Sequence, residues 1–383
     1  MCEIVLTSSL NGRITAYEAI SGTTVARFTG SQSPRHGLAI VGKANYIAAS
    51  HISSSATPSG SIHLYNWWSP TVLHQIPVPE PVVPLAATPD GLFVFAGGIS
   101  GHVYALSIPS GNVINAVPAH NNKPVSCIKI SGHQSSLLIS GGDDGCIAVM
   151  PILGIVADDN QCDFILIRFL AHDGPVTSIT CFTRISCPTI MTSSTDSTCK
   201  VWSLLDGRKL QTIAFPCAIS GVALDPAEVE FYAAGSNGWI YKGILQVGSR
   251  KETIQSVAWA GKHEGGGMVS VVMANGGKNL VCGAEDGSVY MWEREKGEVM
   301  MVLGKHDILS DVIVGRGMGD GTKLIGRGNT YMGLSAKQVD SMQTEDVLSV
   351  TAQDRTRAIH GLQSAIGVYQ RLLNLILKSN KHI

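Results

Sequence analysis

The sequence predicts an all-β fold, a seven-bladed β-propeller that is followed by a C-terminal α-helix forming a coiled coil. A strand–turn–strand motif recurs seven times within the first 292 residues. The turns of this motif are rich in Gly, Asn and Asp, which adopt tight hairpin geometries at little cost. Beyond residue 343 the apolar residues change from strict alternation to the spacing of an amphipathic helix. Together these three observations predict the fold class.

Each copy of the motif joins a short apolar strand to a second strand of alternating apolar residues, as in ISGGDDGCIAVM and CGAEDGSVYMW. Alternation places Ile147 and Val149 on one face of the sheet, where they pack against the neighbouring blade. The intervals between successive turns are 48, 41, 44, 52, 41 and 49 residues. This period is typical of propellers with four strands per blade. The seven turn positions are Gly12, Gly60, Gly101, Gly145, Ser197, Gly238 and Gly287.

The two ends of the repeat array predict how the ring closes. The chain begins with the pattern of a second strand, Glu3 to Ser8, so the first blade lacks an innermost strand. Residues 297–303 suit the last outer strand, and residues 311–314 fit the missing innermost strand. Pairing the two ends in one blade would leave no exposed inner edge. We therefore expect a propeller over residues 1–315, closed by strand 311–314.

Composition excludes several classes of protein. The 383 residues include 28 Lys and Arg against 29 Asp and Glu, a net charge of −1, and only 15% of residues are charged. Bulk disorder and general binding of polyanions are therefore not expected, since disorder needs high charge and polyanion binding needs a basic field. We expect no signal peptide and no membrane span, and nine Cys without a C-x-x-C pair fit a reducing compartment.

Three copies of the motif carry a His that is followed by an Asp at a nearly constant distance. The pairs are His120 and Asp144, His172 and Asp196, and His263 and Asp286, separated by 24, 24 and 23 residues. This spacing resembles that of the WD-repeat proteins. In that family a His, a Ser or Thr, an Asp and a Trp form a buried hydrogen-bonded tetrad within one blade. The resemblance implies one complete tetrad, in the fifth blade, formed by His172, Thr192, Asp196 and Trp202.

Other blades depart from the tetrad pattern. Blade seven has Cys282 where a hydroxyl is expected, and blade four has Met150 where a Trp is expected. An alternative interpretation makes His172, Asp196 and a nearby hydroxyl a catalytic triad. The recurrence of the pair in several blades favours the structural role. The sequence also lacks G-x-S-x-G, H-E-x-x-H, EF-hand and C-x-x-C motifs, so we expect no catalytic residue, cofactor or metal site.

Residues 316–343 form a Gly-rich segment between the propeller and the predicted helix. The segment contains neither a P-loop nor a dinucleotide-binding fingerprint. We interpret it as a flexible linker. The alternative is that Arg316, Lys323 and Arg327 contact RNA phosphates.

Residues 344–379 contain no Pro and are dominated by helix formers. Eight of nine positions at 4,3 spacing are apolar, and Arg355 is the exception. This stripe either lies on the outside of the propeller or pairs with another helix, most simply its own copy in a homodimer. Gly361 and Gly367 each weaken an isolated helix by about 1 kcal/mol, so packing must stabilise it. The predicted oligomerisation residues are Ile359, Leu362, Ile366, Tyr369, Leu373 and Ile376.

A closer resemblance extends from His36 to about Trp292. Over this span the chain is similar to the WD-repeat subunit of the Rix/Ipi complex, including its plant root-initiation-defective type. The segments that carry the resemblance are RHGLAIVGKANYIAAS (35–50), PVVPLAATPDGLFVFAGG (81–98), PVSCIKISGHQSSLLISGGDDG (124–145), VTSITCF…PTIMTSSTDSTCKVWSLLDG (176–207) and AISGVALDPAEVEFYAAGSNGWIY (218–241). The last is the most diagnostic, because its acidic turn is not part of the general WD-repeat consensus.

This resemblance implies a non-enzymatic scaffold of the nucleus, in the nucleolus and nucleoplasm. Its implied partners are a helical-repeat subunit of the same complex, the pre-large-ribosomal-subunit particle and a midasin-type AAA ATPase. The implied role is large-subunit maturation, with removal of the second internal transcribed spacer from pre-rRNA. RNA contact is expected to be at most indirect. The alternative is a generic WD-repeat adaptor, such as a ubiquitin-ligase substrate receptor or a chromatin-complex scaffold.

Overall fold

The computed structural model describes residues 3–10, 12–42, 46–53, 59–131, 136–157, 164–184, 188–245, 253–255, 257–259, 263 and 266–316. The chain separates into two compact units, Met1–Lys323 and Leu324–Ile383. All described residues belong to the first unit. The predicted linker after Arg316 and the predicted helix at 344–379 lie outside them.

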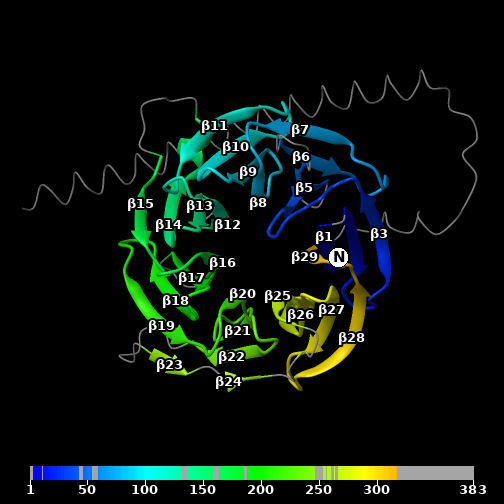
Figure 1. Cartoon of the computed structure of the whole chain (residues 1–383), viewed down its shortest axis with the longest axis vertical. Helices are drawn as coiled ribbons and strands as arrows, with labels where there is room; N and C mark the ends of the chain where they lie inside the picture. The colour runs from blue at the N-terminus through cyan, green and yellow to red at the C-terminus, as the bar shows by residue number, and fades with distance from the viewer. Residues whose placement is uncertain are drawn as a thin grey trace, which may run out of the picture. The chain divides into compact units, whose positions relative to one another are not determined.

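The first unit is a ring of seven β-sheets around a central channel, as Figure 1 shows. The seven-bladed all-β propeller predicted from the sequence is thus confirmed. Within each blade the four main strands are antiparallel to their neighbours, and the first strand of the sheet lies nearest the channel. Blade two consists of β4 (Leu38–Val41), β5 (Tyr46–Ile52), β6 (Gly60–Tyr65) and β7 (His74–Val78). Blade three consists of β8 (Val82–Ala87), β9 (Phe93–Gly98), β10 (His102–Ser107) and β11 (Val113–Pro118). Blade four consists of β12 (Val125–Ser131), β13 (Leu137–Gly142), β14 (Cys146–Pro151) and β15 (Ile167–Leu170).

Blades five to seven follow the same plan, except that blade five has a fifth strand at its outer edge. The strand β23 (Thr253–Gln255) precedes the outer strand of blade six in the chain and pairs in parallel with the outer edge of blade five. Blade six consequently has an outer strand of only two residues, β24 (Val257–Ala258). The other strands of blade five are β16 (Val176–Cys181), β17 (Thr189–Ser194), β18 (Thr198–Ser203) and β19 (Lys209–Ala214). Those of blade six are β20 (Ile219–Leu224), β21 (Glu230–Gly235) and β22 (Ile240–Ile244). Blade seven consists of β25 (Met268–Ala274), β26 (Asn279–Ala284), β27 (Ser288–Glu293) and β28 (Glu298–Lys305).

Blade one combines the two ends of the repeat array. Its strands are β29 (Leu309–Arg316), β1 (Glu3–Ser9), β2 (Arg13–Glu18) and β3 (Thr24–Thr29). The innermost strand β29 pairs antiparallel with β1, in a register that joins Glu3 to Arg316 and Ser9 to Leu309. The residues expected to close the ring, 311–314, form the middle of β29, which extends one residue past the boundary expected at 315.

Two short helical segments connect strands. The helix α1 (Ile152–Val156) follows β14, and its Ile152 and Ile155 are buried in the core between blades three and four. The 3-10 turn η1 (Asn275–Gly277) joins β25 to β26. Among the described residues, no helix has the length and hydropathy that a membrane span requires.

The core of the propeller lies between neighbouring blades. Ile147 and Val149 on β14 belong to the same buried cluster as Val176 and Ile190 of blade five. This arrangement follows from alternation, because one face of each strand points to each adjacent blade. The alternation seen in the sequence therefore predicts which residues pack between blades.

The turn positions depend on residues that tolerate a positive φ. At the tip between β13 and β14, Gly145 has a φ of 73°, and a Cβ there would collide with the carbonyl of His172. Ser197, at the equivalent turn of blade five, adopts a φ of 63°. Gly60 differs from this pattern because it begins β6 instead of occupying a turn. Its connection from β5 is longer than the tight turns of the other blades.

Candidate functional site

The predicted tetrad residues of blade five lie together in one hydrogen-bonded chain. The His172 Nδ1 atom lies 2.8 Å from Oδ2 of Asp196, in the turn between β17 and β18. On the other side of the ring, Nε2 of His172 lies 2.8 Å from Oγ1 of Thr192. The same Oγ1 accepts the indole N–H of Trp202 at 3.0 Å. Alternation places Thr192 and Trp202 on the strand faces that point toward this His.

The electrostatics of this tetrad favour a structural role over a catalytic one. Burial lowers the pKa of His172, and the nearby Asp196 only partly opposes this shift. Burial raises the pKa of Asp196, but hydrogen bonds from Thr198 and His172 outweigh that effect and leave its pKa lowered. The Thr192 side chain is fully buried and already hydrogen-bonded on both sides. Its hydroxyl is therefore shielded from any substrate.

Blades four and seven contain incomplete versions of the tetrad. In blade four, His120 lies 2.9 Å from both Asp144 and Ser140, and the Met150 side chain fills the Trp position. In blade seven, Nε2 of His263 lies 3.2 Å from Oδ1 of Asp286.

The blade-seven substitution has a visible consequence. Cys282 is buried where a hydroxyl would accept the indole N–H of Trp292. Among the described residues, that N–H has no hydrogen-bond partner, although the atom is buried. A buried donor without a partner costs stability. Blade seven is therefore held less tightly by this network than blade five.

Sequence reasoning missed the equivalent contacts in blades one and three. In blade one, Nε2 of His306 lies 2.9 Å from Oγ1 of Thr7, across the junction between the two ends of the array. In blade three, the Glu80 carboxylate accepts hydrogen bonds from the hydroxyls of Ser100 at 2.5 Å and Tyr104 at 2.8 Å. Gly304-Lys305-His306 resembles the Gly-His that precedes the first strand of a WD repeat, so the sequence pointed to His306 but not to its contact with Thr7. Glu80 follows no family spacing, so no sequence signal pointed to it.

A second network, also missed, links the innermost strands around the channel. In four successive blades, a hydroxyl on an innermost strand donates to a main-chain carbonyl of the next innermost strand. These bonds run from Ser126 to Val176 (2.6 Å), Thr177 to Ile219 (2.6 Å), Ser220 to Met268, and Ser270 to Val312 (3.4 Å). The last of them ends on β29, so the closing strand is held by blade seven as well as by β1.

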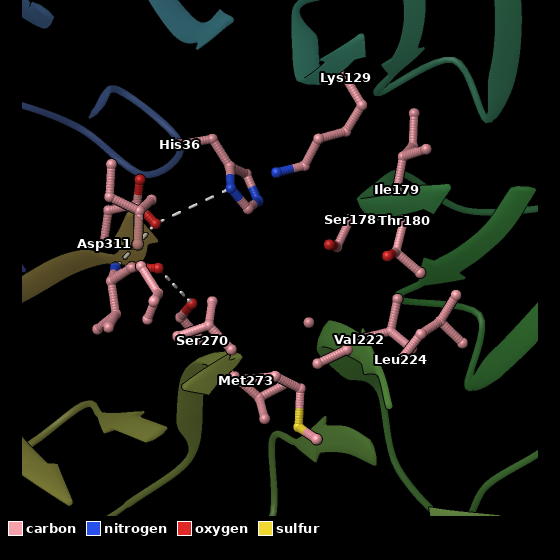
Figure 2. Close-up of a pocket in the computed structure, with 17 residues that line it drawn as sticks. His36, Lys129, Ser178, Ile179, Thr180, Val222, Leu224, Ser270, Met273 and Asp311 are labelled. Carbon is pink, nitrogen blue, oxygen red and sulfur yellow. Dashed lines mark hydrogen bonds and ion pairs between the residues drawn. The ribbon is translucent and has the colours of Figure 1, made fainter. Parts of the chain in front are cut away.

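The segment before β4 crosses the channel. From blade two, Arg35 donates to the carbonyl of Ser220 in blade six, and Nε2 of His36 lies 2.9 Å from the carbonyl of Thr177 in blade five. His36 adopts a positive φ of 57°, a conformation that a non-Gly residue keeps only when its surroundings hold it there. Figure 2 shows the His36 ring projecting into the channel. We call Arg35 and His36 the channel tether.

Comparison with known proteins places these features in a family. The sequence profile of the family "WD domain, G-beta repeat" matches residues 111–149, 164–203 and 253–293. Each matched span contains one of the three His–Asp pairs. A plant protein, Protein ROOT INITIATION DEFECTIVE 3 of Arabidopsis thaliana, is 33% identical over 294 residues, which cover 76% of this chain and 66% of the relative. The chain is a WD-repeat protein.

Two further relatives of this WD-repeat protein come from other kingdoms. WD repeat-containing protein 18 of Homo sapiens is 27% identical over 283 residues, 72% of this chain and 64% of the human protein. Pre-rRNA-processing protein IPI3 of Meyerozyma guilliermondii is 26% identical over 279 residues, 63% of this chain and 61% of the yeast protein. The chain thus covers slightly less than two thirds of each of these relatives. The resemblance stated from the sequence is confirmed by these matches.

A buried carboxylate faces the channel tether of the WD-repeat propeller. The Asp311 side chain on β29 is 1% exposed, and its Oδ1 lies 4.0 Å from Nδ1 of His36. Burial raises the pKa of Asp311 to about 6, although the positive charges of Lys129 and Arg35 oppose the shift. Burial lowers the pKa of His36 to about 3, and the charges of Arg35 and Lys129 reinforce this shift. At neutral pH the His36 ring is therefore uncharged.

Beside this carboxylate the channel contains a cavity of about 260 Å³. Its lining comes from β12, β16, β20, β25 and β29 together with His36. In Figure 2, polar side chains face the cavity from β12 and β16, and apolar side chains face it from β20 and β25. Within the described part of the chain, no group of three or more His, Cys, Asp or Glu side chains is placed to hold a metal ion.

The remaining residues singled out from the sequence belong to the C-terminal part of the chain. The six predicted oligomerisation residues, from Ile359 to Ile376, lie outside the described residues. The same holds for Lys323 and Arg327, whereas the backbone of Arg316 ends β29.

Proposed function

We propose that this WD-repeat protein is a non-enzymatic scaffold for maturation of the large ribosomal subunit and processing of pre-rRNA in the nucleus. The observation that carries the proposal is its relationship to Pre-rRNA-processing protein IPI3, 26% identical over 279 residues. A second yeast protein of that name, from Yarrowia lipolytica, is 23% identical over 259 residues. The step that this chain is proposed to support is removal of the second internal transcribed spacer.

The geometry of the propeller supports a scaffold. The His–Asp pairs of blades four and five are committed to hydrogen bonds within their own blades. The Thr192 hydroxyl, which a triad would use as nucleophile, is fully buried. A propeller instead offers a broad rigid surface, and the proteins that bind to this surface determine its function.

The proposed partners are two proteins and one ribonucleoprotein particle. They are a helical-repeat subunit of the same complex, the pre-large-ribosomal-subunit particle and a midasin-type AAA ATPase. A net charge of −1 supports docking through protein surfaces, with RNA contact at most indirect. Direct binding of RNA requires clustered positive charge.

We further propose that residues 344–379 form a coiled-coil helix that joins two copies of the chain. Replacing Ile366 and Leu373 with Asp would place two carboxylates in the apolar seam, where burial of unpaired charge is costly. Light scattering is expected to give the mass of a dimer for the wild type and of a monomer for the double variant. Replacing Ser364 and Asn374, outside the seam, with Asp adds the same two charges and serves as the control. A monomeric wild type, alone and with partners, would contradict the dimer.

Depletion of the protein followed by probing of total RNA tests the proposed function. We expect precursors that retain the second internal transcribed spacer to accumulate while small-subunit rRNA stays normal. Re-expression of the wild type from a resistant transcript should remove those precursors. Unchanged processing would refute the ribosomal role and leave a WD-repeat adaptor with another client.

A further inference from the structure

The channel cavity presents three polar side chains that form no hydrogen bond or ion pair with another described residue. Lys129 on β12 is exposed toward the cavity and forms no ion pair with any described residue. Ser178 on β16 is only 7% exposed, and no hydrogen bond joins its hydroxyl to another described residue. In Figure 2 the hydroxyls of Ser178 and Thr180 and the Lys129 ammonium all face the same hollow. We call these three residues the channel triad.

The channel triad contrasts with the other inward-facing hydroxyls. Ser126, Thr177 and Ser220 each donate to a carbonyl of the neighbouring blade and are thereby committed to the ring. Ser178 is next to Thr177 in the chain, and the register of β16 with β17 shifts between Val176 and Ser178, so Thr177 is left without a paired residue on β17. The Ser178 oxygen is accessible from the cavity, so water or a ligand can complete its hydrogen bonding.

The charges around the cavity select the ligand. The Arg35 guanidinium is hydrogen-bonded to the Ser220 carbonyl, and the buried His36 ring is neutral. Lys129 forms no ion pair with another described residue, although its positive charge opposes the raised pKa of Asp311. The Asp311 carboxylate lies across the cavity from Ser178 and Thr180. A ligand with two negative charges at one point would be repelled by Asp311, whereas a single carboxylate is matched by one ammonium and two hydroxyl donors.

The remaining walls and the tether set the size of the ligand and its route. Val222, Leu224 and Met273 supply an aliphatic wall suited to a short methylene chain. The tether contacts the carbonyls of Thr177 and Ser220, and the cavity lies farther along the same strands. Access is therefore from the end of the channel at which the innermost strands finish, opposite the tether.

We propose that the central channel binds a carboxylate-bearing aliphatic ligand, with Lys129 as its charge partner and Ser178 and Thr180 as hydrogen-bond donors. The carboxylate belongs either to a free small molecule or to a Glu side chain of a docking polypeptide. This site is independent of the proposed role in pre-rRNA processing, because it is argued from the channel alone.

Calorimetric titration of the full chain tests the proposal with three probes: glutarate, an end-blocked pentaglutamate peptide, and glutaramide as the neutral isostere. We expect saturable binding of a carboxylate probe and none of glutaramide. The variant K129M should weaken that binding by about tenfold or more, and K129R should retain affinity within about threefold. Binding of glutarate identifies a free ligand, and binding of the peptide alone identifies a polypeptide-borne carboxylate.

The matched control is K123M, which removes an exposed Lys in the loop before β12 and should leave the affinity unchanged. S178A tests the channel triad without altering charge, and its affinity should fall by a few-fold. Melting temperatures of all variants confirm that each one is folded, which is expected because Lys129 is exposed. Absence of binding by both carboxylate probes, or equal affinities of K129M and wild type, would overturn the proposal.

Discussion

Replacing Trp202 with Ala is expected to lower the free energy of unfolding by about 3–5 kcal/mol. The Trp202 side chain is 6% exposed and fills the core between blades four and five, with its ring 4.8 Å from that of Phe169. Truncation to Ala leaves a cavity that the rigid sheets on either side cannot close. Denaturation in urea, followed by circular dichroism, measures the change. Replacing the exposed Trp68, 68% accessible to solvent, with Ala is the control and should change stability little.

A pair of Phe substitutions separates the hydrogen bond of Trp202 from its packing. W202F removes the indole N–H that Thr192 accepts, whereas W292F removes an N–H that has no partner among the described residues. The two positions are equivalent in blades five and seven and are almost equally buried. We expect W202F to cost roughly 0.5–1.5 kcal/mol more than W292F. Equal costs would show that the indole bond contributes nothing to blade five.

The same network decides between the structural and catalytic interpretations of His172. H172A removes the link between Asp196 and Thr192 and leaves both groups without their shared partner. A structural role predicts a large loss of stability. A catalytic role predicts the reverse, a lost reaction with unchanged unfolding, and that result would refute the structural role of His172.

Features that depend on local spacing could be predicted from the sequence. The tetrad of blade five lies within one repeat, so the separation of His172 and Asp196 already determines that they can meet across a turn. The packing of Ile147 and Val149 follows in the same way from alternation along one strand. The number of blades follows from the recurrence of the motif, and in six of the seven blades a Gly or Ser with a positive φ occupies its turn.

Features that depend on the diameter of the ring could not be predicted. Arg35 and Ser220 are 185 residues apart, and His36 and Thr177 are 141 residues apart. Their contact exists because blades two, five and six face one channel, and no sequence pattern encodes that distance. The addition of β23 to the edge of blade five could not be predicted either, since three residues carry too little pattern to define a strand. The role of Glu80 could not be predicted, because its carboxylate occupies a position in the blade-three network where the other blades have a different chemical group.

Removing the residues after Lys305 is expected to destabilise the whole propeller, because it deletes the innermost strand of blade one. The deleted strand, β29, buries Leu309 and Val312 in a cluster with Val5 of β1 and Val281 of blade seven. Loss of the burial of those two side chains alone costs roughly 3–6 kcal/mol. Its loss also leaves the inner edge of β1 without main-chain partners, and such edges promote aggregation.

The matched control is a chain that ends at Arg316, which retains β29 and lacks only the residues beyond it. Thermal melting and size-exclusion chromatography should show a folded, soluble protein for this control and early melting or aggregation for the shorter chain. Restoring β29 as a separate peptide, residues 306–316, should raise the melting temperature of the shorter chain, since its register with β1 is defined by seven paired positions. Equal melting of the two truncated chains would contradict closure by this strand.

The comparison isolates closure from the predicted coiled coil, because both truncated chains lack residues 344–379. A difference between them can arise only from residues 306–316, which contribute β29 and His306, the partner of Thr7 across the junction.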